Sequence, residues 1–225
     1  MTRFTYLGID ETSLSIGNGG LIIVACESTN SSLVRSCGYQ SLRKARDYLR
    51  EAEAYTNGGD VCPSKIPEFP SLDEMRVCGL DHFHWMRASY GGRFKRQQIE
   101  HASIAHVVTS NGYNPQRTVL LIDAFHAKPY ETVYLIREYL RLHGFLIPRQ
   151  NIECHGQGDR SVPLINYADL LAFQIGLLLN KKYSQFEAAS LRTVLTPTQI
   201  PFDLHRVKPI EEKGRRILET ILKAA

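Results

Sequence analysis

The spacing of apolar residues predicts two β-strands near the N-terminus. Residues 4–10 form a short run with β-type composition, and residues 21–26 (Leu-Ile-Ile-Val-Ala-Cys) form a second, fully apolar run. The turn-forming sequence Gly-Asn-Gly-Gly at 17–20 separates them. This pattern indicates a hairpin with a long connection.

The rest of the chain alternates between helical and strand patterns. Strands are expected at 118–123, which is apolar on both faces as in a buried central strand, and at 150–154. The predicted helices cover 41–55, 93–110, 129–143, 163–181 and 210–224. A hairpin followed by alternating strands and helices predicts an α/β fold with a central mixed β-sheet flanked by helices.

Length and composition favour one folded domain. The chain has 225 residues, 43% hydrophobic and 22% charged, which excludes a disordered or coiled-coil protein. Residues 56–70 contain two Gly and three Pro without a clear period. We therefore predict a single domain over 1–225 with an insertion around 56–92.

Net charge and the distribution of apolar residues limit which partners and which cellular location we expect for the protein. A net charge of +4 is compatible with an anionic partner but too small for a dedicated electrostatic binder. Polar residues interrupt the longest apolar stretch, 164–179, so no membrane span is expected. A cytoplasmic protein is expected because the N-terminus lacks a leader pattern and the five cysteines form no Cys-x-x-Cys pair. A homo-oligomer is compatible with the sequence, which does not define the oligomeric state.

Three acidic residues lie where apolar residues are expected. Asp10 and Asp123 end predicted strands, and Asp169 lies two turns inside the most apolar helix. An ionised carboxylate in such surroundings costs several kcal/mol unless it is paired or binds a metal. A strand-end Asp alone can simply cap the next turn. If the two strands are parallel neighbours, however, their carboxylates start from positions about 4.8 Å apart.

Clustered carboxylates favour hard divalent cations. Mg²⁺ or Mn²⁺ removes the mutual repulsion of the acids, since both ions prefer oxygen ligands. Two such ions about 3.5–4 Å apart can activate a water and stabilise the leaving oxygen in phosphodiester hydrolysis. The acidic pattern therefore predicts a divalent-metal-dependent nuclease.

The motifs that carry these acids resemble those of the ribonuclease H-like superfamily, closest to the type 2 ribonucleases H. The segments concerned are Gly-Ile-Asp-Glu-Thr at 8–12, Leu-Ile-Asp-Ala at 121–124, and Gly-Asp-Arg-Ser-Val-Pro at 158–163. The resemblance implies a ribonuclease H-like fold and a nuclease that leaves a 5′-phosphate and a 3′-hydroxyl. Carried over residue by residue, it implies that the metal-binding and catalytic carboxylates are Asp10, Glu11, Asp123 and Asp159.

The sequence departs from this family in two places. The Gly-Arg-Gly with which the family reads an RNA–DNA junction is replaced by Thr-Ser-Leu-Ser-Ile at 12–16, so junction-specific cleavage is not implied. The sequence is as compatible with an exonuclease that cuts single-stranded DNA or RNA as with an enzyme that cuts an RNA–DNA hybrid. The sequence Ala-Asp-Leu-Leu at 168–171 also resembles an uncharacterised ribonuclease H-like group with an Ala-Asp helix. There the helical acid would be the last metal ligand, so Asp159 and Asp169 compete for one role.

Glu11 is a weaker candidate than Asp10. Adjacent residues of a regular strand point to opposite faces, so only one of the two can face the site.

Residues 81–96 combine basic side chains with the only tryptophan of the chain. This composition suits a single-stranded nucleic acid, with phosphates on the cations and a base stacked on the indole. The candidates are Trp85, Arg87, Arg93, Lys95 and Arg96. The competing interpretation is a solvated helix start with Trp85 in the core. Two other functions therefore remain open: a non-catalytic nucleic-acid-binding protein of the same fold, and a hydrolase of small phosphate esters.

Overall fold

The computed structural model describes residues 3–14, 20–38, 41–48, 50–51, 69–89, 96–123, 129–180 and 199–200. The structural statements below concern these residues. The predicted helix at 210–224 and most of the Gly/Pro-rich stretch lie outside them.

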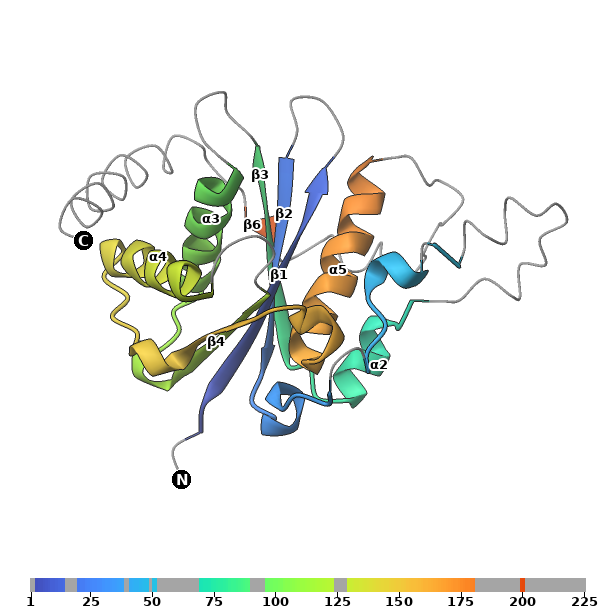
Figure 1. Cartoon of the computed structure of the whole chain (residues 1–225), viewed down its shortest axis with the longest axis horizontal. Helices are drawn as coiled ribbons and strands as arrows, with labels where there is room; N and C mark the ends of the chain where they lie inside the picture. Colours follow the sequence, from blue (N-terminus) through green and yellow to red (C-terminus); the bar gives the residue numbers. More distant parts are fainter. Residues whose placement is uncertain are drawn as a thin grey trace, which may run out of the picture.

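A mixed β-sheet forms the centre of the molecule (Figure 1). Its strands follow the order β5-β4-β1-β2-β3-β6. They are β1 (Thr5–Leu14), β2 (Gly20–Ser28), β3 (His82–Ser89), β4 (Thr118–Asp123), β5 (Ile152–His155) and β6 (Gln199–Ile200). Neighbouring strands β1, β2 and β3 are antiparallel, whereas β4 is parallel to both β1 and β5. The expected hairpin and the expected mixed sheet are thus confirmed.

Helices cover both faces of this sheet (Figure 1). They are α2 (Leu72–Val77), α3 (Arg96–Ser110), α4 (Pro129–Leu142) and α5 (Pro163–Asn180). One hydrophobic core lies between the sheet and the pair α3 and α4, and a second lies between the sheet and α5 with α2. The result is a three-layer α/β/α arrangement. No helix among the described residues has the length and apolar character needed to cross a bilayer.

Strand β3 was not expected from the sequence. It pairs with β2 from His82 to Ser89, and its side chains alternate between the two cores. The insertion predicted around 56–92 therefore does not include residues 82–89, which belong to the central sheet. Strand β1 is also longer than predicted, because it continues to Leu14 and leaves Asp10 in mid-strand.

Gly8 allows α5 to pack directly on β1. A Cβ atom at this position would overlap the backbone carbonyl of Leu164 and lie 2.8 Å from the backbone nitrogen of Ile165. These are main-chain atoms at the start of α5, so they cannot move aside as a flexible side chain can. The absence of a side chain at Gly8 thus sets the distance between β1 and the helix that carries Asp169.

Replacing Gly8 with alanine should therefore destabilise the fold. We expect Gly8→Ala to lower the free energy of unfolding by about 2–4 kcal/mol, since overpacking here displaces backbone. Urea denaturation measures the change. Gly156→Ala is the matched control, because nothing lies within 4 Å of a Cβ built there. Equal stability of the two variants would contradict the close approach of β1 and α5.

Candidate active site

Asp10 and Asp123 lie side by side at the centre of the sheet. Strands β1 and β4 are parallel, and Ile9 is the register partner of Ile122, so the two aspartates follow at the next step. Leu121 belongs to the core under α5, and the two-residue period of a strand places Asp123 on the same face. The expected parallel pairing of these strands is confirmed. Asp10 is only 2% exposed and Asp123 only 4%.

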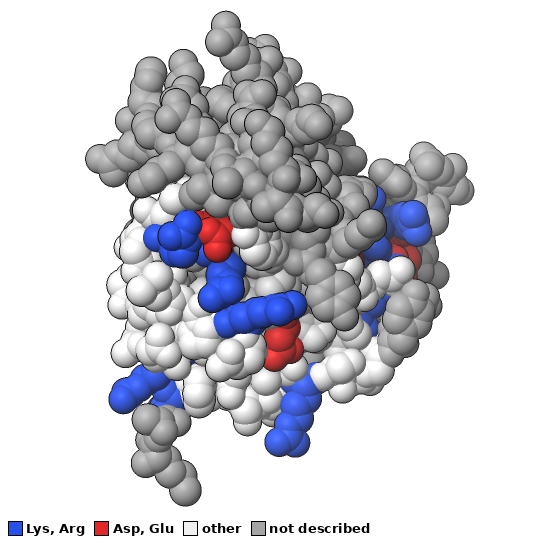
Figure 2. All heavy atoms as spheres, turned by 60° about the vertical axis from the view of Figure 1, so that its left-hand side comes forward, with Lys and Arg blue, Asp and Glu red and all other residues white. Residues whose placement is uncertain are grey.

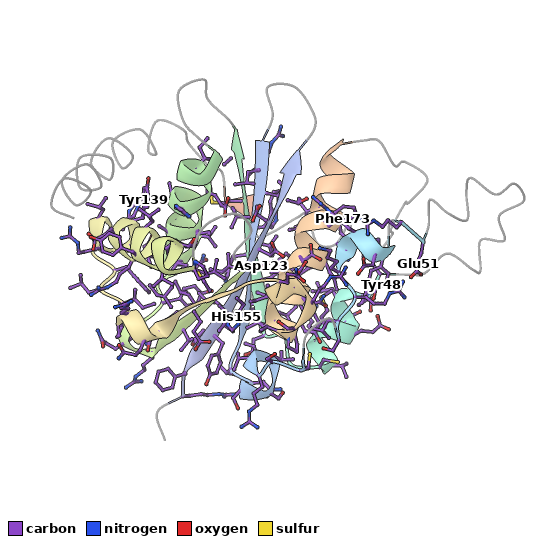
Figure 3. All side chains as sticks on the ribbon, in the orientation of Figure 1. Tyr48, Glu51, Asp123, Tyr139, His155 and Phe173 are labelled. Atoms are coloured by element: carbon purple, nitrogen blue, oxygen red, sulfur yellow. The ribbon has the colours of Figure 1, made fainter. Side chains whose placement is uncertain are left out.

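Asp159 and Asp169 approach this pair from the α5 layer. Asp159 lies in the short helix η5 (Gly158–Arg160), and Asp169 lies two turns into α5. The backbone N–H of Gly158 donates to Oδ1 of Asp123 over 3.0 Å, which ties η5 to the end of β4. Figure 3 labels Asp123 where β4 meets the α5 layer.

The acids are close enough to shift one another's protonation. Burial, together with repulsion from Asp159, raises the pKa of Asp123 to about 7. Burial also raises the pKa of Asp10 well above its usual value, with further repulsion from Asp169 and Asp123. The pKa of Asp169 rises to about 6 through burial, against the lowering effect of a hydrogen bond from the Ala45 N–H. Both competitors for the last ligand position therefore lie near Asp10 and Asp123.

Glu11 occupies the other face of the sheet. Ile9 belongs to the core under α3 and α4, and Glu11 shares its face by the two-residue period of β1. Glu11 is 9% exposed, and its charge still contributes to the raised pKa values of Asp10 and Asp123. Its side chain leaves the strand on the side away from α5, as strand geometry predicts.

A cationic segment at 41–48 lies against Asp159 and Asp169. The sequence analysis did not predict that this segment belongs to the site. The Nζ atom of Lys44 lies 3.4 Å from Oδ2 of Asp159. The backbone N–H of Ala45 donates to Oδ2 of Asp169 over 2.6 Å. The sequence pattern here had predicted only a charged helix, a common solvated element. The available signal was the clustering of Arg43, Lys44 and Arg46 without an acid until Asp47.

Two buried carboxylate oxygens have no hydrogen-bond partner among the described residues. They are Oδ2 of Asp10 and Oδ1 of Asp159. Within the same part of the chain, no three His, Cys, Asp or Glu side chains are arranged so that they could hold a metal ion. The acids are thus gathered in one region without forming a finished coordination shell.

The predicted nucleic-acid contacts are only partly described. Trp85 is 1% exposed and packs in the core under α5, because β3 is an inner strand of the sheet. It therefore cannot stack on a base, and that prediction was wrong. Arg87 is exposed on the same strand. Arg93 and Lys95 lie outside the described residues, as does the side chain of Arg96 at the start of α3.

Without divalent metal, the protein should be more stable at about pH 5 than at about pH 8. The fold raises the pKa of Asp123 to about 7, so between about pH 4 and pH 7 the folded state keeps a proton that the unfolded chain has lost. Stability falls as pH rises through this window, by about 3 kcal/mol for Asp123.

Urea unfolding in EDTA at several pH values measures this slope. Asp123→Asn should flatten it, since the amide stays neutral and its oxygen can still accept from Gly158. Stability that rises with pH across the same window would contradict the crowding of buried acids.

Comparison with known proteins gives only weak similarities. No protein-family model matches the sequence, and no curated protein matches it. The structure is similar to ribonuclease H2 from Pyrococcus horikoshii, with a TM-score of 0.47, 14% identity, and coverage of 94% of this chain and 99% of that chain. It is also similar to ribonuclease HII from Archaeoglobus fulgidus, solved in complex with PCNA, with a TM-score of 0.43, 14% identity, and coverage of 85% and 86%.

Similarities at this level assign neither an activity nor a role for any residue. The architecture itself, a central mixed sheet flanked by helices, is the one predicted from the sequence.

Proposed function

We propose that this protein is a divalent-metal-dependent nuclease that hydrolyses phosphodiester bonds. The proposal depends on one observation: Asp10 and Asp123 lie in register on adjacent parallel strands, buried, with Asp159 and Asp169 brought beside them. Three buried carboxyls and the partly buried Asp169 in one region destabilise the fold unless something cationic offsets them. A function that requires them explains why the chain keeps this arrangement.

The donor chemistry suits Mg²⁺ or Mn²⁺, although the described side chains would have to turn toward one another to complete a site. Carboxylate oxygens are the ligands that hard dications prefer, and two of them, on Asp10 and Asp159, are buried without a donor among the described residues. Asp10, Asp123 and Asp159 would hold the ions. Such ions supply an activated water and charge stabilisation for the leaving oxygen of a phosphodiester.

We propose that Asp169 and Glu11 support the three metal-binding aspartates without being their main ligands. Asp169 already accepts a hydrogen bond from Ala45, so we assign it to positioning the 41–48 segment and the charge balance of the site. Glu11, on the other face of β1, would contribute through its charge or by a rotation of its side chain.

We propose a nucleic acid as the substrate, as either a single strand or an RNA–DNA hybrid. Among the described residues, Lys44 of the 41–48 segment forms an ion pair with Asp159. On the α3 and α4 side, Figure 2 shows scattered Lys and Arg side chains, some of them beside acidic ones. A phosphate that approaches the carboxylates would therefore meet a positive charge beside them.

Replacing the central aspartates should abolish nuclease activity. We expect Asp10→Asn and Asp123→Asn each to lose on the order of 100-fold or more in hydrolysis, because each removes a charged oxygen ligand. Asp159→Asn should lose as much, and Asp169→Asn less. The assay compares single-stranded DNA, single-stranded RNA and RNA–DNA hybrid with Mg²⁺ or Mn²⁺. Asp73→Asn is the control, because Asp73 is an exposed acid on α2.

Other outcomes separate the remaining functions. Failure to degrade all three polymers with either metal would overturn the nuclease proposal. Tight binding of a polymer without hydrolysis would indicate a binding protein of the same fold. Hydrolysis of a small phosphate ester alone would indicate a phosphohydrolase.

A further inference from the structure

The acidic site contains a cation of its own. The Lys44 side chain is 26% exposed, and its Nζ atom lies 3.4 Å from Oδ2 of Asp159, whose side chain is only 5% exposed. Among the described residues, Lys44 is the cation that forms an ion pair with one of the four aspartates of the site, Asp10, Asp123, Asp159 and Asp169. Its partner is also an acid that carries a buried oxygen without a hydrogen-bond donor.

The backbone on both sides of Lys44 is fixed to η5 and α5. Before it, Leu42 N–H donates to the carbonyl of Arg160 over 3.1 Å, and the Asn166 side chain donates to the carbonyl of Arg43 over 2.8 Å. Directly after it, Ala45 N–H donates to Asp169. These bonds hold the main chain so that the lysine reaches the acids, which makes its position a built feature rather than a chance surface contact.

A double ion pair completes the anchoring. The guanidinium of Arg160 contacts the Asp47 carboxylate at two places, each over 3.0 Å. Both side chains are about one-fifth exposed. Arg160 directly follows Asp159, so this pair fixes the 41–48 segment beside the acid that Lys44 contacts.

Charge decides what the lysine does there. The acids of the site repel one another, and a fixed ammonium beside Asp159 offsets part of that repulsion when no metal is bound. A dication that binds Asp159 needs the same carboxylate and lies close to the same positive charge. An ammonium within about 4 Å of the ligand therefore opposes the ion while stabilising the empty site.

We infer that Lys44 is a tethered counter-ion of the carboxylate site, which stabilises the metal-free protein and competes with the divalent cation for Asp159. The inference rests on the proposed function, because it assumes that the acids bind a dication. It adds a means of setting affinity: the ion binds Asp159 against the positive charge of the lysine, which lowers metal affinity.

Calorimetric titration with Mn²⁺ alone, at low salt and without nucleic acid, tests this directly. Lys44→Met should bind Mn²⁺ about three- to tenfold more tightly than the wild type, because the competing charge is gone. Lys44→Arg keeps the charge and should remain near the wild type. Arg141→Gln is the matched control, since it removes one positive charge from α4 on the other side of the sheet.

Thermal unfolding gives a second, independent readout. In EDTA, Lys44→Met should unfold at a lower temperature than the wild type, and saturating Mn²⁺ should raise its unfolding temperature by more. Should Lys44→Met fail to fold, Asp47→Asn serves instead, because it loosens the anchor of the segment and should also tighten Mn²⁺ binding.

Two results overturn the inference, and they differ in what they say about the nuclease proposal. If the wild type binds Mn²⁺ and Lys44→Met binds it with equal or lower affinity, only the counter-ion role is overturned. No saturable Mn²⁺ binding by any variant overturns both. Tighter binding by Lys44→Met in a protein that degrades no nucleic acid supports the inference and rejects the nuclease.

Discussion

Repulsion among buried carboxyls is the constraint on which the site depends. Asp10 and Asp123 come from adjacent parallel strands, so their separation is fixed by the hydrogen bonding of the sheet rather than by side-chain choice. Burial and mutual repulsion raise both pKa values. The fold can keep these groups only if other contacts compensate for them. These contacts include the Glu11 N–H on Asp10, the Gly158 N–H on Asp123 and the cationic segment on the α5 side.

The same face of the sheet shows how the compensation is built. Gly8 brings the start of α5 against β1, which places Asp169 within reach of Asp10. The short helix η5 then brings Asp159 to Asp123 and Arg160 to Asp47. Each of these contacts joins segments that are far apart in sequence. The site is therefore a property of the tertiary fold, and disturbing β1, η5 or the 41–48 segment disturbs it.

Much of the fold was predictable from the sequence, because the relevant signals are local. The apolar run that ends at Asp123 defines β4, and the long apolar helix that begins at Pro163 defines α5. Strand β3 was not predicted because its mixture of histidines, tryptophan and arginine is typical of a polar surface segment. The stacking role proposed for Trp85 was wrong and its alternative placement in the core was right, because its burial depends on pairing with β2, which no local pattern reveals. Lys44 was missed because its ion pair joins it to Asp159, about half the chain away in sequence.

A crystal structure of the wild-type protein grown with Mn²⁺, with anomalous diffraction recorded, tests the central claim most directly. The account predicts anomalous peaks at coordination distance, about 2.0–2.3 Å, from oxygens of Asp10 and Asp123, with Asp159 turned from Lys44 toward the ion. Absence of any peak beside these carboxylates at saturating Mn²⁺, with Lys44 still paired to Asp159, would contradict it.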